Sequence, residues 1–229
     1  MTDTYVTRKG ELTAYFDRTA AEAWKALTSD AKVSRIRETV RAGRDRMRAT
    51  LLSWLPADLS GHSVLDAGCG TGALASEAAG RGAKVVAVDV SASLIATARE
   101  RVPAKGPVEF VVGDMLDPSF GAFDHVVAMD SLIHYEPADV VSALSRLAPR
   151  ARRSIVFTFA PRTPALTLMH AAGRLFPRAD RAPAIVPVAP QRLMDAIRRA
   201  PGLEGFAIGR TLRIKSGFYT SQALELYRT

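Results

Sequence analysis

The sequence has 229 residues and a single cysteine, Cys69; 48% of the residues are hydrophobic and 24% are charged. These values are ordinary for a globular domain and exclude a disordered or fibrous chain, and the lone cysteine excludes an intrachain disulfide. The formal net charge of +8 favours an anionic partner without identifying it.

The chain shows no sign of export or membrane insertion. Residues 1–10 lack the basic-then-apolar layout of a signal peptide, and no apolar run approaches the length of a membrane span. We therefore expect a cytoplasmic protein. The length suits a single domain covering residues 1–229.

Two amphipathic helices are predicted in residues 1–57, which we name the N-terminal arm. Apolar residues recur at steps of three and four from Lys9 to Leu27. The same period resumes after Asp30, a suitable N-cap, and Pro56 stops it. The arginines on the other faces of this second helix are typical of a solvated surface.

Residues 58–160 change to short β-branched runs separated by helical stretches. Such buried runs, alternating with helices, predict a parallel sheet covered on both faces, and ligands bind such sheets at the carboxyl ends of the strands. The five predicted strands are residues 63–67, 84–90, 108–114, 124–130 and 154–160.

The remaining chain departs from this alternation. Residues 161–190 contain six prolines and a short predicted helix from Ala165 to Phe176. We expect an ordered insertion over the carboxyl edge of the sheet that acts as a lid or substrate wall, although a simple connector has the same composition. Residues 191–229 predict a helix from Gln191 to Ala200 and two final strands.

A glycine turn follows the first predicted strand. Gly68, Gly70 and Ala73 satisfy the dinucleotide pattern G-x-G-x-x-[GA], and Asp89 lies where a ribose-binding acid is expected. These features alone would permit NAD. Asp66, two residues before the first glycine, would repel a pyrophosphate but would favour a cation. The turn therefore favours a cationic, phosphate-free nucleoside, which is the chemistry of S-adenosylmethionine. Cys69 is better explained as a small filler of this turn than as a nucleophile.

Two further acids support this cofactor. Asp89 ends the second strand, and Asp114 ends the third, where it could accept a hydrogen bond from the adenine amino group while Met115 flanks the ring. Each acid alone could simply cap a helix. Together with Asp66-x-Gly68-x-Gly70-x-Gly72 they resemble class I S-adenosylmethionine-dependent methyltransferases. That resemblance implies an α/β, Rossmann-like fold with a mostly parallel seven-stranded sheet and an antiparallel last strand.

The methyl acceptor is indicated by the segment after the fourth strand. It lacks an Asn-Pro-Pro-Tyr-like stretch, so we expect no nucleic-acid partner. It has instead MDSLIHYEP, in which His134 and Tyr135 lie just beyond the strand end.

A closer resemblance extends over nearly the whole chain. The segments that carry it are AYFDRTAAEAW, VRAGRDRM, VLDAGCGTGALA, MDSLIHY, FAPRTP, LFPR and GFYTSQALE. Together they resemble the magnesium-protoporphyrin IX O-methyltransferases of chlorophyll and bacteriochlorophyll biosynthesis. The resemblance implies methyl transfer from S-adenosylmethionine to a propionate of magnesium-protoporphyrin IX. The alternative is a class I methyltransferase acting on another small anionic or phenolic acceptor.

The resemblance also implies site residues. His134 and Tyr15 are the expected catalytic residues, each a hydrogen-bond donor to the propionate; a structural histidine and a core aromatic are the alternatives. We expect no protein-bound metal, because the magnesium arrives inside the porphyrin and His62, His125 and His170 lack metal-ligand spacing. The expected cofactor-binding residues are Asp66, Gly68, Gly70, Gly72, Asp89, Val90, Asp114, Met115, Met129 and Arg41.

Two kinds of partner remain predictions. The porphyrin-binding subunit of magnesium chelatase could hand over the acceptor. The apolar faces of the first helix and of residues 165–176 permit peripheral membrane contact, and a buried core would produce the same pattern.

Overall fold

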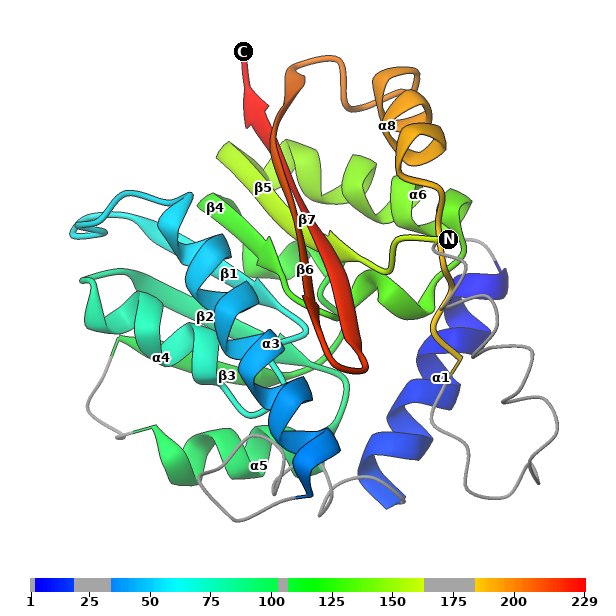
Figure 1. The fold of residues 1–229 in the computed structure, drawn as a ribbon. Helices are drawn as coiled ribbons and strands as arrows, with labels where there is room; N and C mark the ends of the chain where they lie inside the picture. The colour runs from blue at the N-terminus through cyan, green and yellow to red at the C-terminus, as the bar shows by residue number, and fades with distance from the viewer. Residues whose placement is uncertain (1–2, 19–33, 103–106, 163–183) are drawn as a thin grey trace, which may run out of the picture.

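The computed structural model describes residues 3–18, 34–102, 107–162 and 184–229. Their centre is a seven-stranded sheet with the order β3-β2-β1-β4-β5-β7-β6 (Figure 1). The first five strands pair in parallel, whereas β7 pairs antiparallel with both β5 and β6. The strands are β1 (Ser63–Ala67), β2 (Lys84–Asp89), β3 (Val108–Val112), β4 (Phe123–Ala128), β5 (Ala151–Phe159), β6 (Phe206–Ser216) and β7 (Tyr219–Arg228).

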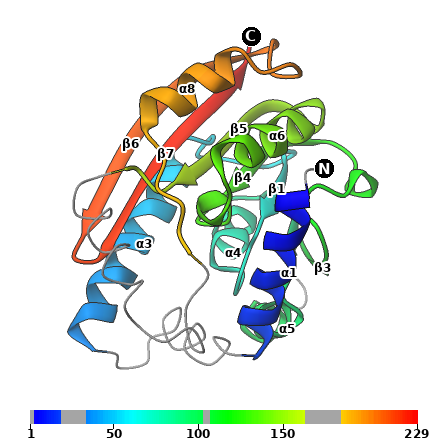
Figure 2. The same ribbon diagram turned by 90° about the vertical axis from the view of Figure 1, so that its right-hand side faces the viewer.

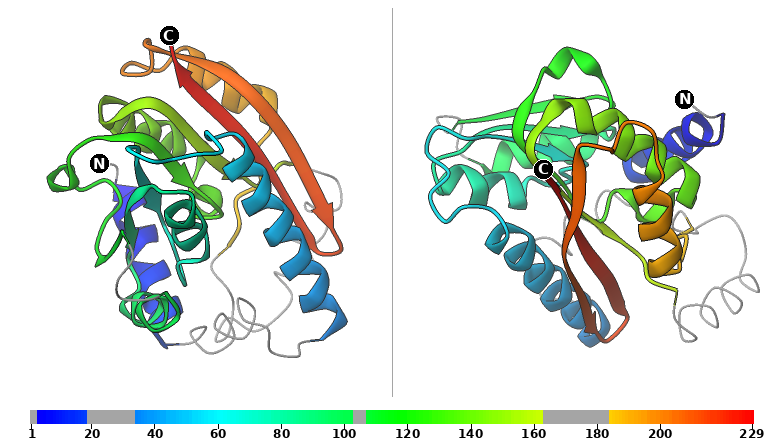
Figure 3. Two further views of the ribbon diagram at one scale, coloured as in Figure 1. Left: turned by 90° about the vertical axis from the view of Figure 1, so that its left-hand side faces the viewer. Right: turned by 90° about the horizontal axis from the view of Figure 1, so that it is seen from above.

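Helices cover both faces of the sheet. One face carries α3 (Arg35–Ser53) and α4 (Ala73–Gly80), and α3 lies along the hairpin of β6 and β7 (Figure 3). The other face carries α6 (Pro137–Leu147) and α8 (Pro190–Arg198), which lie side by side (Figure 2). α5 (Ala92–Arg101) packs on β2 and β3, and α1 (Asp3–Arg18) packs against α5.

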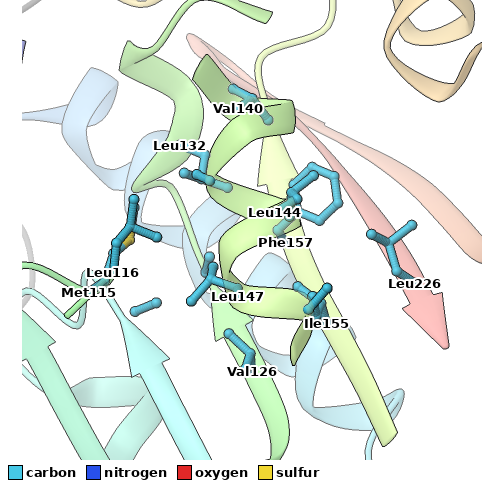
Figure 4. Packing of buried hydrophobic residues seen from close by; sticks show 14 of the residues in the cluster. Met115, Leu116, Val126, Leu132, Val140, Leu144, Leu147, Ile155, Phe157 and Leu226 are labelled. Atoms are coloured by element: carbon cyan, nitrogen blue, oxygen red, sulfur yellow. The ribbon is translucent and has the colours of Figure 1, made fainter. Parts of the chain in front are cut away.

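Alternating strand residues supply the two hydrophobic cores. Val126 and Ile155 point to the core under α6, whereas Val127 and Val156 belong to the core under α3 and α4. Figure 4 shows Leu144 and Leu147 of α6 packed against the first of these cores. Short 3-10 turns at Pro118–Phe120 (η1), Leu132–His134 (η2) and Ala148–Arg150 (η3) complete this half.

The predicted helices of the N-terminal arm are shifted in the structure. α1 begins at Asp3, six residues before the predicted start at Lys9, and its prediction beyond Arg18 lies outside the described residues. Asp30 also lies outside them, and the described N-cap of α3 is Ser34, whose hydroxyl accepts a hydrogen bond from the Arg37 backbone N–H. The predicted helix at residues 165–176 is likewise outside the described chain.

The two described ends of the 161–190 segment meet at one point. Pro161 forms an isolated parallel bridge with Val188, and the Val188 N–H donates to the Ala160 carbonyl at 2.8 Å. The Val186 N–H donates to the Ile133 carbonyl at 2.8 Å. The base of the segment therefore lies at the carboxyl end of β5, beside η2.

Candidate active site

The glycine turn joins β1 to α4 and needs glycine at each repeat. Gly68, Gly70 and Gly72 have φ values of 85°, 54° and 80°, which L side chains rarely adopt. A Cβ on Gly68 would lie 2.3 Å from the Cβ of Ser131, and a Cβ on Gly72 would lie 2.8 Å from the Phe110 ring. The N–H groups of Gly68 and Cys69 both donate to the Val88 carbonyl, which joins the turn to the end of β2.

Asp66 is the most unusual carboxylate of the site. Its side chain is 1% exposed, and its Oδ2 has no hydrogen-bond partner within the described residues. Burial and the charge of Asp89 raise its pKa to about 7. A buried carboxylate oxygen without a hydrogen-bond partner is stabilised when a cation binds next to it. The surroundings of Asp66 therefore fit the cationic cofactor that the sequence predicts.

The surroundings of the cysteine in this turn disfavour a reactive thiolate. Burial and the neighbouring carboxylates raise the pKa of the Cys69 thiol well above its ordinary value. The thiol therefore stays protonated at neutral pH, as expected for a small filler.

Asp89 bridges the glycine turn and α5. Its Oδ2 accepts from the Gly70 N–H at 2.8 Å, and its Oδ1 accepts from the Ser91 N–H at 2.9 Å. Burial raises the pKa of Asp89 despite these two donors. The Ser91 hydroxyl in turn donates to Asp17 of α1 at 2.6 Å, so the arm is attached next to this acid.

β3 ends at Val112, two residues before the predicted end at Asp114, so Asp114 lies in the loop that follows the strand. Asp114 is also held by α1. The Tyr5 hydroxyl and the Lys9 ammonium donate to its two oxygens, each at 2.9 Å. Burial alone would raise the pKa of Asp114, but Lys9, the Leu116 N–H and Tyr5 together lower it. Asp114 is therefore ionised and ties the arm to the sheet, in addition to any contact with adenine.

The loop after β4 carries the predicted catalytic histidine. His134 ends η2, is partly buried, and has its Nδ1 3.4 Å from the Ala184 carbonyl oxygen. The next residue, Tyr135, is buried and stacks on Tyr5 with ring centroids 4.8 Å apart. The loop is thus held between α1 on one side and the 184–188 segment on the other.

Tyr15 lies on α1 between the two points where that helix is attached. Asp17 holds the helix at Ser91, and Tyr5 holds it at Asp114. Tyr15 is partly buried, and burial raises the pKa of its phenol, so the hydroxyl is a donor at neutral pH.

The other predicted cofactor residues lie on the same edge of the sheet or on α3. Val90 and Met115 directly follow Asp89 and Asp114, and Met129 follows the end of β4. Arg41 is partly buried on α3, three residues before Arg44, so both lie on one face of the helix.

Sequence reasoning missed two residues of this site. Ser131 lies against Gly68, and its buried Oγ has no partner in the described chain. Asp130 has φ 51° and is the one residue other than glycine with positive φ in the described segments. Ser131 and Asp130 belong to the MDSLIHY segment that the sequence analysis singled out, but their residue types alone indicated no role there. The described residues include no group of three or more metal-ligating side chains.

Comparison with known proteins identifies the family. A protein-family model described as "Magnesium-protoporphyrin IX methyltransferase C-terminus" matches residues 128–228, and a second family model, described as "Methyltransferase domain", matches residues 64–153. A magnesium-protoporphyrin O-methyltransferase of Rhodobacter capsulatus is 49% identical over 228 residues, which cover 98% of this chain and 99% of that protein. This chain belongs to the magnesium-protoporphyrin O-methyltransferase family.

Solved structures agree with this assignment. A magnesium protoporphyrin IX methyltransferase from Synechocystis PCC 6803 with bound SAH has a TM-score of 0.84 and 30% identity, covering 97% of this chain and 100% of that one. The same enzyme with bound SAM has a TM-score of 0.77 and 27% identity, covering 97% of each chain.

Membership of the magnesium-protoporphyrin O-methyltransferase family confirms three predictions. The fold is that of a class I methyltransferase, the enzyme is a methyltransferase, and its cofactor is S-adenosylmethionine. Within the described part of the chain, no helix is long and apolar enough to cross a bilayer.

Proposed function

We propose that this enzyme transfers a methyl group from S-adenosylmethionine to a propionate carboxylate of magnesium-protoporphyrin IX, giving the monomethyl ester. The observation that carries the cofactor half of this proposal is the buried Oδ2 of Asp66, which has no partner in the described chain. The relatives' names support the acceptor half.

The cofactor site would be formed by the turn and strand ends described above. Asp66 would supply negative charge near the cationic groups, Asp89 would accept from the ribose hydroxyls, and Asp114 from the adenine amino group. Val90, Met115 and Met129 would line the nucleoside, and Arg41 would hold the cofactor's carboxylate. Gly68, Gly70 and Gly72 would let the backbone approach the cofactor closely. The bound cofactor supplies an electrophilic methyl group on a sulfonium.

The acceptor needs alignment more than it needs a base. A propionic acid has a pKa of about 4.3, like a glutamate side chain, so the acceptor is already ionised at neutral pH. We assign Tyr15 and His134 as hydrogen-bond donors that orient the propionate and exclude water from it. Such alignment can contribute several kcal/mol to lowering the barrier.

The predicted partners belong to this proposal. The porphyrin-binding subunit of magnesium chelatase would deliver a poorly soluble acceptor directly, and peripheral membrane contact would serve the same purpose. Failure of the chelatase subunit to change the turnover of this enzyme would count against the first partner. Failure of the enzyme to sediment with lipid vesicles would count against the second.

The first test is a chromatographic assay with S-adenosylmethionine and magnesium-protoporphyrin IX. Metal-free protoporphyrin and a phenolic acid are run in parallel. We expect the monomethyl ester mainly from the magnesium porphyrin, with little pH dependence above about pH 6 at saturating cofactor, because the propionate is already charged. No ester from either porphyrin, with cofactor still bound, would refute the acceptor. Product from the phenolic acid would favour the alternative function.

Two substitutions test the residues of the acceptor site. His134→Ala and Tyr15→Phe each remove one hydrogen bond to a charged group, so kcat should fall about tenfold to a hundredfold. Cofactor affinity, measured by calorimetry, should change little. Tyr227→Phe, at an exposed tyrosine of β7, is the matched control and should keep wild-type kcat. A kcat unchanged in His134→Ala would remove that residue from the catalytic site.

A further inference from the structure

The Asp130 carboxylate is buried and accepts several hydrogen bonds, although the function proposed above gives it no role. The Asp130 side chain is 3% exposed, and Arg44 donates to its Oδ2 at 2.8 Å. The Tyr219 hydroxyl lies 3.1 Å from Oδ1 and 3.2 Å from Oδ2. Thr158 and Ser221 donate to Oδ1 at 3.2 and 3.3 Å. The Asp130 carboxylate thus has four side-chain donors.

These donors come from three different elements. Arg44 lies on α3, Thr158 on β5, and Tyr219 and Ser221 on β7. The Asp130 N–H also donates to the Thr158 hydroxyl at 2.7 Å, so backbone and side chain are fixed together. We call these five residues the Asp130 network.

Gly43 allows the network to form. It lies inside α3, where glycine normally lowers helix stability by about 1 kcal/mol. A Cβ at this position would lie 2.5 Å from Cδ1 of Tyr219. Glycine here therefore lets the Tyr219 ring lie against α3 with its hydroxyl at Asp130.

The backbone of Asp130 determines where the following loop goes. Its left-handed conformation costs about 1 kcal/mol in a residue with a Cβ, and it turns the chain sharply at the end of β4. The next residue, Ser131, then packs against Gly68, and η2 with His134 follows directly. One residue thus sets the position of the loop relative to the glycine turn.

We propose that Asp130 is a positioning residue. The Asp130 network holds it so that His134 keeps its position relative to the cofactor-binding turn. The proposal rests on the function proposed above, because it assumes that His134 aligns the acceptor. Asp130 itself need not touch either substrate.

The test uses substitutions that loosen the network without removing Asp130. Tyr219→Phe keeps the ring and removes one donor, and we expect a fall in kcat of about threefold. Arg44→Met removes the ion pair and should lower kcat about tenfold, whereas Arg44→Lys keeps the charge and should restore most of it. Gly43→Ala displaces Tyr219 from outside the site and should resemble Tyr219→Phe.

Matched controls separate positioning from loss of fold. Tyr227→Phe removes a hydroxyl from the same strand at an exposed position. Gly80→Ala adds a methyl group at the end of α4, where a Cβ meets nothing within 4 Å. Both should keep wild-type kcat. Every variant is assayed well below its Tm and at saturating cofactor, with its cofactor Kd measured separately, because Arg41 lies on the same helix as Arg44 and Met129 directly precedes Asp130.

The outcomes distinguish this inference from the proposed function. Wild-type kcat in folded Arg44→Met and Gly43→Ala would overturn the inference, since the network would then be only structural. If the wild-type enzyme does not methylate the porphyrin, the proposed function fails, and the ring signals of His134 in NMR spectra of histidine-labelled protein still test the network. Those signals, assigned with His134→Ala, should shift in Gly43→Ala but not in Gly80→Ala; unchanged signals would overturn the positioning role.

Discussion

At the scale of single residues, Asp66 makes cofactor binding depend on pH. The pKa of Asp66 is raised to about 7, so in the free enzyme its carboxyl group is largely protonated below pH 7. A cationic ligand favours the ionised form, so binding at lower pH must first release a proton. We expect cofactor affinity to fall about tenfold between pH 8 and pH 6.

Titration calorimetry checks this dependence. In buffers of different ionisation enthalpy, the wild type should release close to one proton per cofactor at pH 6. Asp66→Asn should bind more weakly at pH 8, with affinity that no longer changes across this range. A wild-type affinity that is flat from pH 6 to pH 8 would mean that Asp66 is not the titrating group.

At the scale of elements, α1 is attached to the sheet by polar contacts at both ends. The Tyr5 hydroxyl donates to the ionised Asp114, and the Tyr5 ring stacks on Tyr135. Tyr5→Phe keeps the stacking but loses a hydrogen bond to a charged group, worth about 1.5–3 kcal/mol. Hydrogen exchange of α1 should therefore become about tenfold or more faster, with the strands of the sheet unaffected.

The control for α1 is Val6→Ala. Val6 is the next residue on the same helix and is 49% exposed. Its truncation should leave exchange in α1 unchanged. Equal exchange in Tyr5→Phe and Val6→Ala would show that the Tyr5 hydroxyl does not hold the helix.

At the scale of the whole molecule, His125 couples stability to pH. His125 is 5% exposed, its Nδ1 lies 2.8 Å from the Ser154 hydroxyl, and its ring stacks on His62. Burial, and after it the charge of His62, lowers the pKa of His125 to about 4. The unfolded chain takes up this proton near pH 6.5, before the folded chain does. The free energy of unfolding should therefore fall between pH 6.5 and pH 4, by about 3 kcal/mol from this residue.

Asp66 acts in the opposite sense, because its folded pKa is raised rather than lowered. The measurement is therefore the difference in unfolding free energy between the wild type and His125→Gln, by urea denaturation at pH 7 and pH 4.5. We expect the wild type to lose more stability on acidification than the variant. Equal losses would show that His125 does not become protonated on unfolding.

Much of the fold was predictable because it depends on local patterns. Buried β-branched runs predicted the parallel strands, and the glycines with Asp66 predicted the cofactor chemistry. Helix ends were predicted less well: α1 begins at Asp3 because Tyr5 packs on Tyr135, a contact with a residue 130 positions later. Its polar sequence before Lys9 shows no helical period in apolar residues.

By itself, the sequence determined the class of fold, the cofactor and the family, because these depend on short motifs in which several residue types occur together at fixed spacings. The tertiary structure alone decided which groups support the site. Arg44, Thr158 and Tyr219 are far from Asp130 in sequence, and Asp17 is far from Ser91. Such contacts depend on how helices and strands pack together, and no local pattern of residues records that packing.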